Sequence, residues 1–112
     1  MSADRLAQWQ DEEAALRARR SRPTGTITHA EVVGRPGLDV LRDMLAGHLP
    51  ASPIAESLDF LLVHVAPGEA AFQGRPGPRF LNPMGGLHGG WYATLLDSAV
   101  GCAVHTTMQP GR

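Results

Sequence analysis

The residues whose types and spacing could do chemistry lie in one stretch, from Asn82 to Asp97. It opens with a loop in which four of nine residues are glycine, and it ends inside an apolar segment, Trp91 to Met108. A Gly-Gly pair at a helix start presents free backbone N–H groups at the positive end of the helix dipole. Such a site suits a phosphate or the developing oxyanion of an acyl transfer. The alternative is that the glycines only turn the chain, since their spacing fits neither the phosphate-loop nor the dinucleotide pattern.

Asp97 is the one formally charged residue of the apolar segment. The segment has no proline and is long enough for about five helical turns. Its apolar residues lie nearly all round, which predicts a buried helix. A carboxylate inside such a helix is costly unless it has a partner or a task. Its helical neighbours are small or apolar, so we expect Asp97 to be desolvated, with Gly101 leaving room for an acyl group. The alternative is a carboxylate that accepts from a backbone N–H.

Helical and alternating patterns, prolines and glycines predict the elements that must position these residues. In chain order they are a helix over residues 3–20, a linker over 21–36, a helix from Leu38 to Ala46 stopped by Gly47, a loop from His48 to Pro53, a hairpin of strands 57–66 and 69–74 around Pro67-Gly68, and a loop from Arg75 to Arg79. The first helix has a thin apolar stripe (Leu6, Trp9 and Leu16), which favours an accessory helix on a surface. Two strands cannot cover the eighteen-residue apolar helix. We therefore expect the sequence to lack a C-terminal part of the domain.

Length and composition exclude several classes of protein. The chain has 112 residues, is 43% hydrophobic and carries a net charge of −1, so it is at most one small domain with no electrostatic reason to bind nucleic acid or a membrane surface. The single cysteine, Cys102, excludes an intrachain disulfide and is expected to be a core thiol. The polar start and the lack of a long apolar run predict a soluble, cytoplasmic protein. The histidines have no ligand spacing, so we expect no metal and no cofactor.

The run Asn82-Pro-Met-Gly-Gly-Leu-His88-Gly-Gly, followed by Thr94-Leu-Leu-Asp97-Ser-Ala, closely resembles the hotdog-fold acyl-CoA thioesterases of the phenylacetate-pathway type. The resemblance covers roughly residues 37–108. It implies an α+β fold in which a curved antiparallel sheet wraps a long central helix. Residues 1–36 would then be an accessory helix and linker, and residues 37–112 the N-terminal portion of the thioesterase domain.

The resemblance also implies roles for the residues of the motif. Asp97 would attack the thioester or activate a water molecule. The Gly89 N–H would lie in the oxyanion hole with Gly90 close by. His88 and Asn82 would bind and orient the thioester carbonyl or the attacking water. The alternative for His88 is a histidine at the helix start that only holds the loop.

Gly90, Gly101 and Thr94 are expected to contact the substrate, an aryl- or medium-chain acyl-CoA. The resemblance implies a homodimer or homotetramer. His88 and Asp97 are nine residues apart, so on one helix they point to opposite sides and lie about 13 Å apart along the axis. We therefore expect active sites shared between chains. The alternatives are a non-catalytic acyl-CoA-binding module of the hotdog fold and an inactive, truncated fragment of the enzyme.

Overall fold

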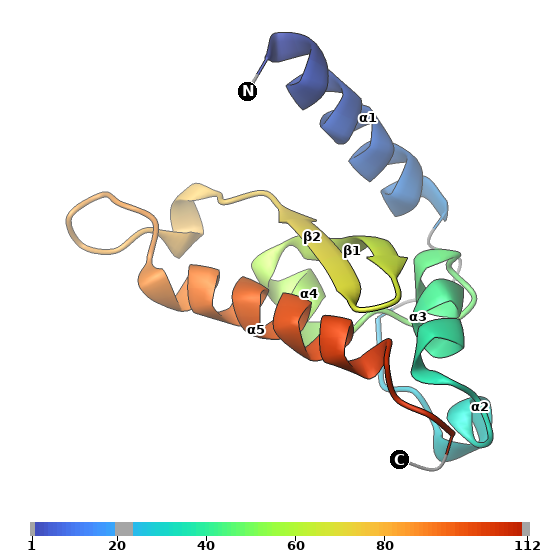
Figure 1. Cartoon of the computed structure of the whole chain (residues 1–112). Coiled ribbons are helices and arrows are strands. Elements are labelled where there is room, and N and C mark those ends of the chain that lie inside the picture. The colour runs from blue at the N-terminus through green and yellow to red at the C-terminus, as the bar shows by residue number, and fades with distance from the viewer. Residues whose placement is uncertain (1, 20–23, 111–112) are drawn as a thin grey trace.

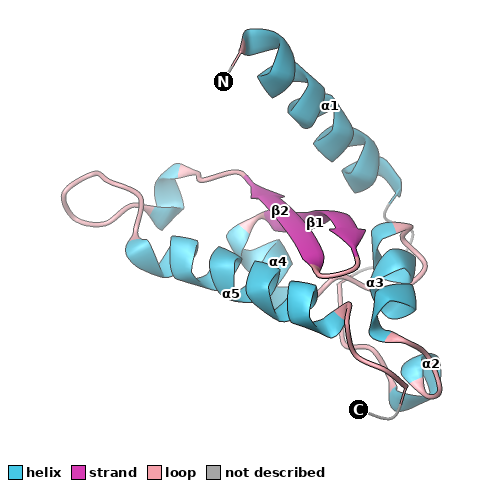
Figure 2. Ribbon diagram, in the orientation of Figure 1, coloured by secondary structure: helices cyan, strands magenta, loops and turns pink. Residues whose placement is uncertain are grey.

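The fold is mixed α+β, as the sequence predicts: a two-stranded antiparallel sheet, several short helices and two helices of 17 residues, one at each end of the described chain (Figures 1 and 2). The computed structural model describes residues 2–19 and 24–110. The elements in chain order are α1 (Ala3–Arg19), α2 (His29–Val32), α3 (Gly37–Leu45), α4 (Pro53–Leu58), β1 (Phe60–Ala66), β2 (Glu69–Gly74), a 3-10 turn η1 (Pro78–Phe80) and α5 (Gly89–His105).

The strands β1 and β2 form the predicted hairpin. Gly68 in the turn has φ +75°, a left-handed conformation that glycine adopts at little cost. The register pairs Phe60 with Gly74 at the open end, and a bulge interrupts it between Leu62 and His64. Because a bulge places two residues opposite one, it shifts the alternation of faces in the second half of β1. The first three residues of β1 precede the bulge and are buried in succession, so both faces of the strand are covered there.

Helix α4 occupies residues that the sequence analysis divided between a loop and a strand. Pro53 stands in its first turn, where the missing N–H removes no helical hydrogen bond. The helix ends at Asp59, which has a left-handed φ of +56°. Ser57 is therefore helical, and β1 begins at Phe60 rather than at Ser57.

The predicted linker also contains a helix, α2, which the sequence analysis missed. The carboxylate of Glu31 accepts from the backbone N–H of Thr28 at 3.1 Å, the reciprocal contact of a capping box. The part of the linker at residues 21–23, and Arg20 in the predicted first helix, lie outside the described residues. Helix α3 matches its prediction to one residue at each end, and Gly47 follows it with φ +86°.

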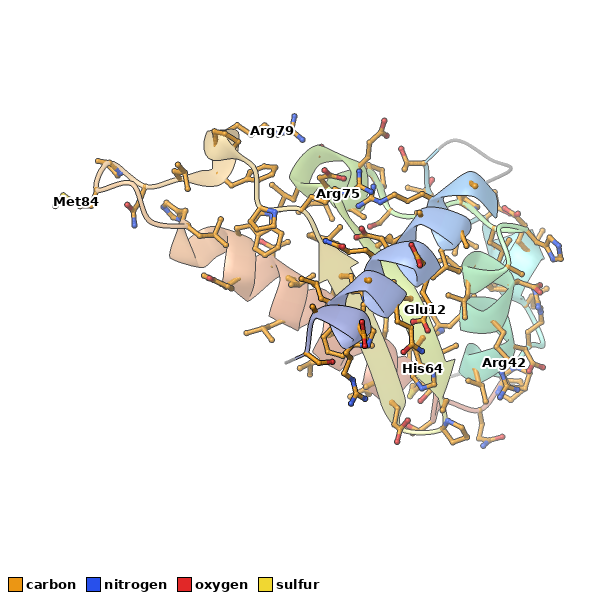
Figure 3. All side chains as sticks on the ribbon, turned by 90° about the horizontal axis from the view of Figure 1, so that it is seen from above. Glu12, Arg42, His64, Arg75, Arg79 and Met84 are labelled. Atoms are coloured by element: carbon orange, nitrogen blue, oxygen red, sulfur yellow. The ribbon has the colours of Figure 1, made fainter. Side chains whose placement is uncertain are left out.

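The hairpin separates two helices that run over its opposite faces. In Figure 1 α5 lies below the strands and α1 above them, and Figure 3 shows α1 crossing in front of both strands. Phe60, only 1% exposed, contacts Phe72 and Trp91 edge to face. The indole N–H of Trp91 donates to the Leu58 carbonyl at 2.8 Å. Trp91 thus anchors the start of α5 to the hairpin and to α4.

The prediction that the long helix is buried is wrong for this chain. Within the described residues, Trp91 is the one buried residue of α5. Leu96, Val100 and Val104 are 61%, 63% and 58% exposed. The physical reason is that the hairpin covers one side of α5 only. The helix also starts two residues before the predicted Trp91 and ends three before Met108.

Candidate active site

The glycine-rich loop before α5 is held by the side chain of Asn82. Its Oδ1 accepts from the backbone N–H groups of Met84 at 2.9 Å and Gly86 at 3.0 Å. Gly85 has φ +86°, which this tight turn requires. The loop extends away from the body of the molecule, with Met84 at its tip and 92% exposed (Figures 1 and 3). The oxygen of Asn82 is therefore committed to the loop, and a contact between its amide nitrogen and a substrate stays a prediction.

His88 caps the start of α5. Its Nδ1 accepts from the Gly90 N–H at 2.8 Å. A neutral imidazole that accepts at Nδ1 carries its proton on Nε2, so the exposed ring keeps one donor. One interpretation of His88 was that it only holds the loop at the helix start. The contact with Gly90 shows that the side chain does cap the helix there.

The two glycines at the start of α5 differ in what they still offer. The Gly90 N–H is taken by His88, whereas the Gly89 N–H has no acceptor in the part of the chain that the structure describes. A Cβ built at Gly89 meets nothing within 4 Å, so the space around it is open. Of the two backbone N–H groups, that of Gly89 is therefore the one free to donate to an oxyanion at the positive end of the helix.

Asp97 lies in the middle of α5, and its expected desolvation is wrong for this chain. The residue is exposed, because its neighbours on the helix surface, Val100 and Gly101 among them, are themselves exposed. Among the described residues its carboxylate has no hydrogen bond and no ion pair, so it does not accept from a backbone N–H either. The group is unengaged and accessible.

A largely apolar pocket of about 390 Å³ lies beside this carboxylate. Helix α5 contributes two pairs of residues four apart, Asp97 with Gly101 and Ser98 with Cys102. The other walls come from α1, α3, α4, both strands and the loop between α3 and α4, and include Leu16, Met44, Ile54, Leu61, Leu62 and Phe72. A Cβ at Gly101 meets nothing within 4 Å, which agrees with the expected room for a substrate group. The pocket can hold an apolar group next to a free carboxylate.

Of the lining residues, the sequence analysis assigned only Asp97 and Gly101 to a site, and three of those it missed are Ser98, Cys102 and Leu16. Ser98 carried no signal beyond its place next to Asp97. Cys102 was expected in the core; it packs against the core cluster and also borders the pocket, and burial raises the pKa of its thiol. Leu16 belongs to the helix assigned to an accessory role. The signal available for it was Glu13, an acidic residue within the apolar stripe of that helix.

The predicted site residues fall into two groups that the structure does not bring together. His88, Gly89 and Gly90 form the start of α5 with Asn82 in the loop before it, and Asp97 and Gly101 border the pocket. Thr94 lies between the groups. Its hydroxyl donates to the Gly90 carbonyl at 2.8 Å, and the residue does not line the pocket. Because α5 is continuous, its rise keeps His88 and Asp97 about 13 Å apart along the axis.

Comparison with known proteins gives no relative: no family model, no curated protein and no solved structure matches this chain. Among residues 2–19 and 24–110, no group of three or more His, Cys, Asp or Glu side chains is placed to hold a metal ion. Over the same ranges, no helix has the length and apolar character that crossing a membrane requires.

Proposed function

We propose that this chain carries a thioesterase site of the hotdog type, which hydrolyses an aryl- or medium-chain acyl-CoA to the free acid and CoA. The observation that carries the proposal is the apolar pocket of about 390 Å³ with the Asp97 carboxylate on its wall. Ligand pockets of this kind combine apolar walls with a few polar groups that fix orientation. The motif from Asn82 to Asp97 is the second support.

The residues divide the chemistry between them. Asp97 either attacks the thioester carbonyl carbon, giving an acyl-enzyme anhydride that water then hydrolyses, or takes a proton from the attacking water. In both routes the C–S bond breaks, and the CoA sulfur leaves and takes up a proton. The Gly89 N–H and the Nε2–H of His88 are the donors for the oxyanion that forms between these steps.

The distance between the two groups of residues implies two chains per site. A carbonyl and its attacking group must come within about 3.5 Å of each other. His88 and Asp97 on one α5 are much farther apart than that. Each site would therefore take His88 and Gly89 from one chain and Asp97 from a second copy, and a two-fold dimer yields two such sites. A homodimer, or a homotetramer built from two of them, fits this arrangement.

Replacing Asp97 by Asn tests the proposal. The change removes the base or nucleophile and keeps the side-chain volume, so turnover of octanoyl-CoA or phenylacetyl-CoA should fall about a hundredfold or more. The measurement is the release of free CoA thiol. Asp11→Asn is the matched control, because Asp11 is likewise exposed on a helix but lies on α1, away from the pocket lining. Its turnover should equal that of the wild type.

A binding measurement on the same variants separates an enzyme from an acyl-CoA-binding module. An acyl-CoA analogue in which an ether replaces the thioester should bind the wild type and Asp97→Asn alike. If the wild-type chain binds this analogue but releases no thiol from the thioester, the protein is a binder and the hydrolytic proposal is wrong. Equal turnover by the wild type and Asp97→Asn would exclude the role given to Asp97.

A further inference from the structure

Helix α1 is covered by the rest of the molecule at one small patch. Of its residues whose side chains the structure describes, Glu13, Leu16 and Arg17 are the ones that are not exposed. Leu6 and Trp9, in the N-terminal half, are 45% and 37% exposed. Figure 1 shows this half leading away from the hairpin. The three residues of its C-terminal half are thus the ones that the body of the molecule covers, whereas Leu6 and Trp9 border an open hollow beside the end of β2.

Two ion pairs fix that patch at the open end of the hairpin. A guanidinium nitrogen of Arg17 lies 2.9 Å from Asp59, and the Nε of Arg75 lies 3.3 Å from Glu13. Asp59 and Arg75 are joined to each other, because the Arg75 N–H donates to the Asp59 carbonyl at 2.9 Å. The side chain of Glu13 is only 7% exposed, so salt screens its pairs less than it screens those of a surface carboxylate.

Leu16 is held between these charges and forms part of the pocket wall. Residues three and four apart lie on one face of a helix, so Leu16 points the same way as Glu13. It lines the pocket that Asp97 borders, while Leu6 lies on a separate hollow along α1. Leu16 is the one pocket residue from α1, a helix that precedes the part of the chain on which the thioesterase resemblance rests.

We propose that Leu16 determines substrate specificity: its side chain closes part of the apolar pocket and limits the length of the acyl group that fits. The identity of the occupant rests on the proposed function. A shorter side chain at this position frees room for further methylene groups. Each methylene that becomes buried strengthens binding by about fourfold.

The first test reads the pocket without any hydrolysis. Cys102 lines the same pocket and is the only cysteine of the chain, so its alkylation reports what can enter. The probes are N-ethylmaleimide and N-octylmaleimide, and the readout is the ratio of their rates, long over short. The ratio should rise several-fold in Leu16→Ala and fall in Leu16→Phe. Leu6→Ala, the same substitution on the same helix, should leave it at the wild-type value.

Two opposite substitutions keep the test decisive if one of them disturbs folding. Local loosening of the fold would raise the alkylation rates of both probes in Leu16→Ala and in Leu16→Phe. If Leu16 instead forms the pocket wall, the ratio of the long to the short probe rises in Leu16→Ala and falls in Leu16→Phe. A ratio that moves the same way in both variants, that stays constant in both, or that moves equally in Leu6→Ala overturns the proposal.

The second test measures hydrolysis over a series of acyl lengths. The ratio of kcat/KM for octanoyl-CoA to that for hexanoyl-CoA should rise about sixteenfold in Leu16→Ala, since two more methylenes find apolar contacts. It should be unchanged in Leu6→Ala. If the wild type hydrolyses no acyl-CoA, the proposed function fails and the alkylation ratios alone decide the role of Leu16. If hydrolysis is present and its length preference is the same in Leu16→Ala and the wild type, the specificity role is refuted while the proposed function stands.

Discussion

The side chain of Asn82 holds two backbone N–H groups with one oxygen, and this gives the glycine loop its shape. The contacts to Met84 and Gly86 bring the loop back toward the start of α5, where His88 and Gly89 lie. Asn82 therefore influences the candidate oxyanion site whether or not it touches a substrate.

Substituting Asn82 separates these two roles. Asn82→Ala removes the acceptor, so the amide protons of Met84 and Gly86 should exchange about fivefold faster or more, since a hydrogen bond contributes about 1 kcal/mol. Asn82→Asp keeps an acceptor oxygen and should preserve the wild-type exchange rates. Amide hydrogen exchange by NMR provides both measurements.

If these two amides exchange in the Ala variant at the wild-type rate, Asn82 does not hold the loop. Turnover of the Asp variant then tests the amide nitrogen. If the Asp variant keeps the loop but loses hydrolysis, the Nδ2 group contacts the substrate or the attacking water.

Sequence reasoning selected Asp97 as a candidate site residue but did not predict its surroundings. A carboxylate among apolar helix neighbours marked Asp97, which in the structure borders the apolar pocket, and its role in a site stays a prediction. Its desolvation could not be predicted, since solvent access depends on what covers the neighbours. In this chain Val100 is 63% exposed, so Asp97 is exposed with it.

At the scale of elements, Gly74 allows α5 to pack against β2. A Cβ at this position would lie 2.7 Å from Cζ2 of Trp91, closer than non-bonded atoms tolerate. Trp91 is the buried anchor of α5, so it has little room to move. The absence of a side chain at Gly74 is what lets the indole ring rest on the strand.

Gly74→Ala should therefore destabilise the fold by about 1–3 kcal/mol through overpacking. Gly77→Ala is the matched control, because a Cβ there meets nothing within 4 Å and φ is −83°, which alanine adopts without strain. The control should be neutral or more stable by up to about 1 kcal/mol. Urea denaturation followed by Trp fluorescence compares the two. Similar losses in both variants would show that Trp91 does not depend on the space at Gly74.

Long or strongly patterned elements could be predicted from sequence, and short ones could not. The Pro67-Gly68 turn and the residues around it predict the hairpin correctly. Helix α4 was missed because its six residues begin with Pro53, which was interpreted as a loop residue rather than as a helix start. Helix α2 has four residues, too few for a periodic pattern, and its capping pair Thr28 and Glu31 was the available signal.

At the scale of the whole molecule, the shared-site proposal can be tested by mixing two inactive chains. His88→Ala and Asp97→Asn should each be nearly inactive on their own. After refolding together in equal amounts, about half of the dimers are mixed and each mixed dimer rebuilds one intact site of two, so about a quarter of wild-type activity should return. The measurement is release of CoA thiol by the whole mixture. The mixed dimer, isolated through two different affinity tags, should show about half of the wild-type activity.

A mixed dimer without activity would exclude a site that takes His88 from one chain and Asp97 from the other. Full activity of either single variant would exclude that residue from the site. The sequence predicted that α5 needs cover because apolar residues surround it. It could not predict which surface supplies the cover, since periodicity describes the helix and carries no information about its partner.

The continuity of α5 restricts how this protein can change length during evolution. Inserting one residue between His88 and Asp97 would turn every later side chain by about 100° and move Asp97 off the pocket wall. Even four residues, which nearly restore the face, would shift it by about 6 Å along the axis. The number of residues from the cap of α5 to its carboxylate should therefore stay fixed while other parts of the chain change in length.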